Sequence, residues 1–371
     1  MFSKYSSDLY VTESVEVNGD VTGVTHTPIA DQDTFGMTSG INAASRFGLK
    51  GTEDLGNGMK VSFKLENGFS SDDGQLGNGG RLFGREASVT LSGAFGDVSF
   101  GRMGGLASSA GTYDIFALYT DAFDGGDNNI GSGFAMSDRY DNMITYATPE
   151  MAGLKVYAQY SFQQDGIEED QVANNDRYMA LGATYNVGNL GLVAVVDSFQ
   201  YSNKLLNPDT VSDEEPAIYN PKDDGLTFNV GMNYDCGFTK TFAGVQIARH
   251  VKTMVNLQNV MQFIGSEDPA GDNYNNGLDG WAATVGTQFP VGSGSVTTAF
   301  YYADSEESVA DEDGDKARAT YYGISARYVY PLSTRTSLYT GAGWSKTNLK
   351  SSRIDEDLNV IQAYAGLTHS F

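Results

Sequence analysis

The residues best suited to act on ions are four aspartates in one long stretch of the chain. Residues 103–138 carry Asp114, Asp121, Asp124 and Asp127 and contain no lysine or arginine. A row of carboxylates in a narrow water-filled passage attracts cations and sorts solutes by charge and dipole. The alternative role for the same stretch is an exposed acidic surface loop. Its length makes it more than an ordinary hairpin connection.

Residue types for catalysis or tight metal binding are scarce. The three histidines, His26, His250 and His369, lie far apart in the sequence, and Cys236 is the single cysteine. A disulfide within the chain or a zinc ligand set therefore cannot form. The order of residues supports neither a nucleophile–base–acid set nor a pair of catalytic carboxylates. We expect the chain not to be an enzyme and to need no cofactor.

The charge of the chain is strongly negative. Lys and Arg total 23 against 47 Asp and Glu, a formal net charge of −24, which argues against nucleic acid as a partner. The acidic run DEDGDK (311–316) suggests calcium, but an EF-hand loop needs glycine at its sixth position and an acid at its twelfth. Here Gly314 is fourth and Tyr322 is twelfth. We expect no dedicated metal site, only weak Ca²⁺ or Mg²⁺ binding to acidic loops.

Apolar and polar residues alternate strictly along much of the chain, which predicts β-strands that place their charged side chains on one face. In residues 59–69, apolar side chains at Met59 and Phe63 share one face, while Lys60 and Lys64 share the other. About sixteen such segments recur, most near the roughly 9–11 residues of a tilted membrane-spanning strand. The same parity puts Arg46 on a face with Lys50.

Short and long connections alternate between the strands. Short turns such as 149–153 and 186–189 are followed by long acidic connections such as 163–176 and 202–224. A barrel with tight turns on one rim and long loops on the other has this rhythm. Each acidic run lies between two strands, so the sequence predicts a single domain over residues 1–371.

A soluble β-sandwich also alternates and is the competing interpretation. Two features favour a membrane barrel: Tyr and Phe cluster at strand ends, as in interfacial belts, and the polar face persists on strand after strand. A barrel pairs its last strand with its first, which leaves no edge in lipid. The terminal Phe371 would then lie at the membrane rim, facing hydrocarbon.

The N-terminus fits a processed chain. No run approaches the roughly 18 consecutive apolar residues of a transmembrane helix. The first residues, MFSKYSSDLY, lack the apolar core of a signal peptide. The chain is therefore either cytoplasmic or a mature form with an added Met, and the barrel interpretation favours the mature form, with its signal peptide absent.

Three segments of the chain have a distinctive sequence: SRFGLKGTEDLGNGMKVSFKLENGF (45–69), GGRLFGREASVTLSGAFGDVSFGR (79–102) and DNMITYATPEMAGL (141–154). They resemble the trimeric general porins of Gram-negative outer membranes, most closely those of β-proteobacteria. The resemblance is close over about residues 40–160 and rests on strand rhythm and the terminal Phe beyond them. SSDLYVTESVEV resembles a family first strand.

The resemblance implies an all-β fold: a 16-stranded antiparallel transmembrane β-barrel whose third loop, about 103–138, folds inward to form a constriction. It further implies a homotrimer in the outer membrane of a Gram-negative bacterium, in contact with lipid and lipopolysaccharide. The family's terminal aromatic, here Phe371, is read by the barrel-assembly machinery.

The resemblance also assigns roles to charged residues. A basic wall facing the loop acids would contain Arg46, Arg85 and Arg139, with Lys60 and Lys64 inward by parity. Alternation argues against Arg85, because Ala87, Val89 and Leu91 share its parity. Arg102 shares parity with Val98 and Phe100, which suggests the outer wall, and would meet Asp72 or Asp73 of a neighbouring subunit in a trimer contact.

These features predict a water-filled channel for passive diffusion of ions and small hydrophilic solutes. The alternatives are a substrate-specific channel and a structural or adhesive surface barrel. The basic wall favours anions, whereas the net charge and the acidic loop favour cations. Because the pore mouth is acidic, the sequence favours a channel that prefers cations.

Overall fold

The computed structural model describes most of the chain. It leaves out residues 1, 8–9, 18–19, 29–31, 124–125, 128–129, 169–173, 203–222, 255–276, 311–313 and 351–354, and gives only the backbone for residues 2–7, 10–17, 20–28, 32, 126 and 356.

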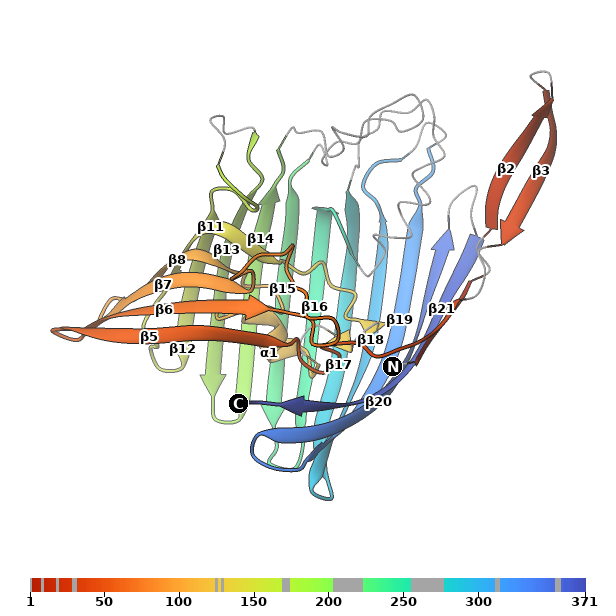
Figure 1. Cartoon of the computed structure of the whole chain (residues 1–371). Coiled ribbons are helices and arrows are strands. Elements are labelled where there is room, and N and C mark those ends of the chain that lie inside the picture. Colours follow the sequence, from red (N-terminus) through yellow and green to blue (C-terminus); the bar gives the residue numbers. More distant parts are fainter. Residues whose placement is uncertain are drawn as a thin grey trace.

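Fifteen antiparallel strands pair in series to form one curved wall (Figure 1). Each strand pairs with the next along the chain, and β8 pairs with β11 across the long third connection. In order they are β5 (Arg46–Gly56), β6 (Met59–Gly68), β7 (Glu86–Gly93), β8 (Gly96–Gly104), β11 (Arg139–Ala147), β12 (Leu154–Ser161), β13 (Arg177–Val187), β14 (Leu190–Gln200), β15 (Gly225–Asp235), β16 (Lys240–Val251), β17 (Leu278–Val291), β18 (Gly294–Glu307), β19 (Arg318–Pro331), β20 (Thr336–Lys350) and β21 (Asp355–His369).

The N-terminal segment continues this wall beyond β21. Strand β1 (Phe2–Ser7) pairs antiparallel with β21, so the last strand pairs with an N-terminal strand as expected, but that strand lies mostly before the segment SSDLYVTESVEV expected as the first strand. On its other side β1 pairs with the short β4 (Gln32–Phe35). Among the described residues no pairing joins β4 to β5, and the sheet is not closed there.

The predicted first strand is partly wrong. Residues of β2 (Tyr10–Val17) pair with β3 (Asp20–Pro28) in a separate two-stranded hairpin, which projects away from the wall in Figure 1. The polar run from Thr12 to Ser14 explains the difference. With Glu13 between Val11 and Val15, this segment lacks the continuous apolar face that a lipid-exposed strand needs.

The wall is apolar outside and polar on its concave side. On β15, Phe228 is 50% exposed and its neighbour Asn229 only 1%. The pattern recurs at Ile324 and Ser325 of β19 and across β21, as the alternation predicted. An exposed apolar face with a buried polar one is typical of an outer-membrane barrel. In the part of the chain that is described, no helix has the length and apolar character to cross a membrane.

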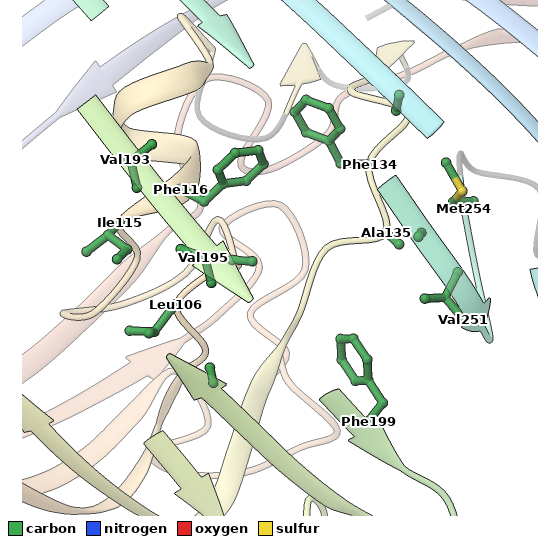
Figure 2. Close-up of a cluster of buried hydrophobic side chains, with 14 of the residues drawn as sticks. Leu106, Ile115, Phe116, Phe134, Ala135, Val193, Val195, Phe199, Val251 and Met254 are labelled. Atoms are coloured by element: carbon green, nitrogen blue, oxygen red, sulfur yellow. The ribbon is translucent and has the colours of Figure 1, made fainter. Parts of the chain in front are cut away.

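The third connection folds onto the concave face, as predicted. It contains α1 (Phe116–Thr120) and the short β9 (Gly126–Asp127) and β10 (Ile130–Gly131). Leu106 and Phe116 of this loop are fully buried in a cluster with Val193 and Val195 of β14 (Figure 2). Apolar packing against the wall therefore holds the loop inside the sheet's curve.

Glycines in the wall make room for the loop. A Cβ built on Gly244 of β16 would lie 2.7 Å from the Cβ of Thr120, and one on Gly343 of β20 would lie 2.8 Å from Cγ1 of Ile130. Both distances are shorter than real Cβ contacts allow. The backbone of the loop can approach the wall this closely only because these positions carry no side chain.

Gly244→Val should displace α1 from the wall. The added side chain would overlap Thr120, and overpacking of this kind costs about 1–3 kcal/mol. We expect a lower unfolding temperature and a changed single-channel conductance, measured on the same refolded protein. Ala243→Val is the matched control, since Ala243 is next in β16 and faces the other side. Equal effects of both variants would contradict the packing argument.

Candidate functional site

Four arginines line one cavity of about 590 Å³ on the concave side of the wall. They are Arg46 of β5, Arg85 just before β7, Arg139 of β11 and Arg327 of β19. Ser109 and Phe123 of the inward-folded loop also line it. The cavity therefore lies where the loop faces both flanks of the wall, the arrangement of a pore constriction.

The predicted wall arginines Arg46, Arg85 and Arg139 are thus brought together. The objection to Arg85 from alternation does not apply, because β7 begins one residue later, at Glu86. Within the strand the alternation is regular, with Glu86 and Ser88 buried and Val89 exposed. Arg85 belongs to the connection, so strand alternation does not decide the direction of its side chain.

Two glutamates that we did not predict accompany this cluster. Nε of Arg85 donates to Glu66 at 2.7 Å, and Nζ of Lys64 donates to Glu86 at 2.7 Å. Thr112 of the loop also donates to Glu86, which ties the loop to β7. Glu66 shares the inward parity of Lys64, so the alternation already contained the signal for it.

The two predicted lysines do not line the cavity. Lys64 is held by Glu86, and its Nζ also lies 3.7 Å from Glu66. Lys60 is exposed and stands opposite Asp54 in the β5–β6 pairing. Both keep the inward parity that the sequence predicts, but they lie outside the cluster of arginines.

None of the loop aspartates that the structure describes lines the cavity. Asp121 is 5% exposed and its Oδ1 accepts the Phe123 backbone amide at 2.8 Å, at the end of α1. Asp127 is fully buried and accepts a hydrogen bond from the Tyr364 hydroxyl of β21. Asp114 is half-buried. Asp124 lies outside the described residues.

Burial also governs the charge of Asp127. Removal from water raises the pKa of its carboxyl, while the Tyr364 hydroxyl and the nearby Arg327 guanidinium lower it in part. Nη1 of Arg327 lies 3.7 Å from Oδ1 of Asp127. Asp127 therefore helps to anchor the loop through Tyr364 and lies close to Arg327, but it is not itself exposed to ions in the cavity.

Arg327 is the cavity residue that sequence reasoning did not select. Its guanidinium lies over the ring of Phe123, 4.7 Å from the ring centroid, and its side chain is 12% exposed. Alternation in β19 had placed it on the face opposite Ile324 and Tyr328, so its inward direction was predictable. Arg327 lies beside three arginines from much earlier in the chain because the sheet curves. The sequence does not give this curvature.

Asp127→Asn should shift ion preference towards anions. The change removes the carboxylate nearest Arg327, while the amide can still bond with the Tyr364 hydroxyl and keep the loop in place. We expect the reversal potential in a salt gradient to move in the anion-selective direction. Asp121→Asn is the matched control, because it removes the same charge from the same loop at a carboxylate that accepts the Phe123 backbone amide. A shift towards cations would contradict this assignment.

The predicted trimer-contact residues lie near the rim. Arg102 donates to Asp141 of its own chain at 2.8 Å. Asp73 accepts the Gln75 backbone amide at 2.9 Å, and Asp72 accepts a hydrogen bond from Ser70. Both aspartates are exposed, and their role in a trimer stays a prediction. Phe371 follows β21, is fully exposed, and contacts the ring of His369 edge-on.

The described residues contain no group of three or more metal-ligating side chains. Asp311 and Asp313 of the acidic run 311–316 lie outside the described residues. Weak binding of Ca²⁺ or Mg²⁺ by acidic loops stays a prediction.

The chain is similar to known outer-membrane proteins along most of its length. The family model of the Gram-negative porins matches residues 6–349. An outer membrane porin protein of Bordetella pertussis is 31% identical over 91% of this chain and 85% of its own length. Outer membrane porin protein 32 of Delftia acidovorans is 27% identical over 85% of this chain and 78% of its own. Among solved structures, the anion-selective porin from Comamonas acidovorans matches with a TM-score of 0.56, at 23% identity over 100% of this chain and 98% of its own.

The chain belongs to the Gram-negative porins. It is an outer-membrane β-barrel with an inward-folded third loop, and it forms a channel for passive diffusion of ions and small hydrophilic solutes.

Proposed function

We propose that this porin is a homotrimeric, non-enzymatic channel that prefers anions, with selectivity set by the four cavity arginines. The observation that carries the proposal is the composition of the cavity lining. Among the described residues it includes Arg46, Arg85, Arg139 and Arg327 and no acidic side chain.

The local charge outweighs the net charge of the chain in this proposal. Among the side chains that the structure describes, Arg85 has a carboxylate partner at 2.7 Å, on Glu66, whereas the carboxylates beside Arg139 and Arg327 lie at 4.0 Å and 3.7 Å. The loop acids Asp121 and Asp127 are buried outside the cavity lining, and Asp127 lies beside one of the four arginines, Arg327. Acids on exposed connections, such as Asp72 and Asp73, act through water, where charges are screened with a Debye length of about 8 Å at physiological salt. This argument reverses the cation preference that net charge suggested.

The relatives lend support at the level of the fold. One structural neighbour is titled an anion-selective porin, and another neighbour's title names a trimer form. The exposed apolar outer face, with Phe47 and Leu49 on β5, supports contacts with lipid and with neighbouring subunits. Lipopolysaccharide at the outer rim and recognition of Phe371 by the barrel-assembly machinery complete the proposal.

Single-channel recording of the refolded, unheated protein in a planar bilayer tests the channel class. We expect conductance steps in groups of three that grow linearly with salt concentration. Conductance that saturates and is blocked by one solute would instead indicate a substrate-specific channel. A folded barrel that inserts without conducting would overturn the proposal in favour of a structural or adhesive surface barrel.

A further inference from the structure

The two neighbouring cavity arginines Arg85 and Arg139 are not directed inward by strand pairing. Each stands where a strand begins, and the next residue in each case, Glu86 or Tyr140, is buried on the concave side. Adjacent residues of an extended strand point to opposite faces. The backbone amide of Arg85 donates to the Glu66 carbonyl at 3.1 Å, and Arg139 pairs with Gly104 of β8. A further contact on the main chain beside these arginines can then direct their side chains into the cavity.

Arg102 of β8 supplies such a contact. Its Nε donates to the carbonyl oxygen of Gly84 at 2.8 Å, and its Nη1 donates to the carbonyl oxygen of Arg139 at 3.2 Å. Gly84 directly precedes Arg85. One guanidinium thus bonds the main chain beside both cavity arginines, and its planar array of donors suits this bridging better than an ammonium group would.

Asp141 in turn fixes Arg102. Its Oδ1 accepts from Nη1 of Arg102 at 2.8 Å, and its Oδ2 accepts the Gly166 amide at 2.8 Å. Nη1 of Arg81 donates to the same carboxylate at 2.7 Å. The β8–β11 pairing shifts register between Tyr140 and Met143, which places Asp141 in a bulge beside Arg102.

We propose that Arg102 and Asp141 form a positioning pair that sets the selectivity of the channel without lining its pore. The inference rests on the proposed function, in which Arg85 and Arg139 belong to the selectivity cluster. The pair holds the backbone at Gly84 and Arg139, and thereby the spacing of two neighbouring guanidinium groups in the constriction. The contacts of Arg102 inside its own chain also compete with a role as a trimer contact.

The side-chain exposures fit this assignment. Those of Arg102 and Asp141 are 16% and 13%, so both are withdrawn from bulk water and their mutual attraction is weakly screened. Arg318 and Asp304 form a second Arg–Asp pair on β19 and β18, with Nη2 to Oδ2 at 2.7 Å; the Arg318 side chain is 56% exposed, and neither residue lines the cavity. This second pair provides a matched control.

The test compares ion permeability ratios of Arg102→Lys, Arg85→Gln and Arg318→Lys from reversal potentials in a KCl gradient. Arg102→Lys keeps the charge and loses the bridge. We expect it to change the permeability ratio in the same direction as Arg85→Gln, by about two- to threefold. The reason is that a guanidinium displaced by a few ångströms interacts less strongly with ions in the water-filled pore. Arg318→Lys should leave the ratio unchanged.

Asp141→Asn is the second variant, and it serves if Arg102→Lys does not fold. Loss of a carboxylate would by itself favour anions, whereas loss of positioning moves the ratio in the direction of Arg85→Gln, so the sign separates the two effects. An unchanged ratio in a folded Arg102→Lys trimer overturns the proposal. Dissociation of that trimer with an unchanged ratio per channel also overturns it and supports a subunit contact instead. If the wild type prefers cations, the proposed function fails, but the comparison with Arg85→Gln still tests the pair.

Discussion

Replacing Arg46 and Arg139 together by glutamine will shift the channel strongly towards cations. Both side chains line the cavity. A unit charge about 4 Å from a passing ion contributes about 1 kcal/mol even in water. Loss of two such charges should therefore lower the anion-to-cation permeability ratio roughly tenfold or more. The measurement is the reversal potential of the double variant in a KCl gradient.

A double lysine variant controls for net charge. Lys50→Gln with Lys60→Gln removes two positive charges from inward-facing positions of β5 and β6 that do not line the cavity. We expect a far smaller shift than in the arginine variant. Equal shifts would mean that selectivity follows the total charge of the chain, and an unchanged reversal potential in the arginine variant would contradict our placement of the constriction.

The second large effect is expected at Gln246, which ties the third loop to the wall. Gln246 is fully buried, and its Oε1 accepts the Ala135 backbone amide at 2.6 Å. Its Nε2 donates to the Ala135 carbonyl at 3.2 Å and to Oδ1 of Asn229 at 2.6 Å. Gln246→Leu would leave these buried partners without their bonds, at about 1–3 kcal/mol each.

The expected result of Gln246→Leu is a loop that moves within the open channel. Current noise in the open state should rise, and hydrogen exchange at residues 134–137 should speed up at an unchanged strand content. Gln288→Leu is the control, since Gln288 lies near the C-terminal end of β17 and its Nε2 donates to Thr297 of the neighbouring β18 at 3.4 Å. Quiet channels with slow exchange in Gln246→Leu would show that apolar packing alone holds the loop.

Much of the fold was predictable because each strand carries its own pattern. In β6 and β21 the alternation of apolar and polar residues identifies the strand and assigns every side chain to a face. The length and composition of residues 103–138 likewise set that connection apart. In contrast, the hairpin of β2 and β3 was missed, because its polar run matched a family pattern without the apolar face that such a strand requires.

The site was less predictable, because its members meet only through the curvature of the sheet. Asp127 looked like a lumen acid, yet it is anchored to Tyr364, which lies 237 residues away. Parity also failed at Arg85, because it applies only within a strand, and Arg85 lies one residue outside β7. Contacts between residues this far apart in sequence determine which charged side chains are buried, and therefore which of them are exposed to the pore.

The same reasoning explains why net charge misleads about selectivity here. The acids of the chain outnumber its bases by 24, but the cavity lining carries four arginines. Charges at a narrow point act on ions at short range, and charges on the rim act through screening water. The ion selectivity of this channel should therefore depend less steeply on salt concentration than that of a channel whose selectivity is set by charges at its rim.

The sign of the wild-type reversal potential across a tenfold KCl gradient tests the central claim most directly. The account predicts the sign of an anion-preferring channel, which the Arg46 and Arg139 double variant loses. A cation-preferring sign in the wild type would contradict it and would show that the acidic rim, and not the arginine cavity, governs the pore.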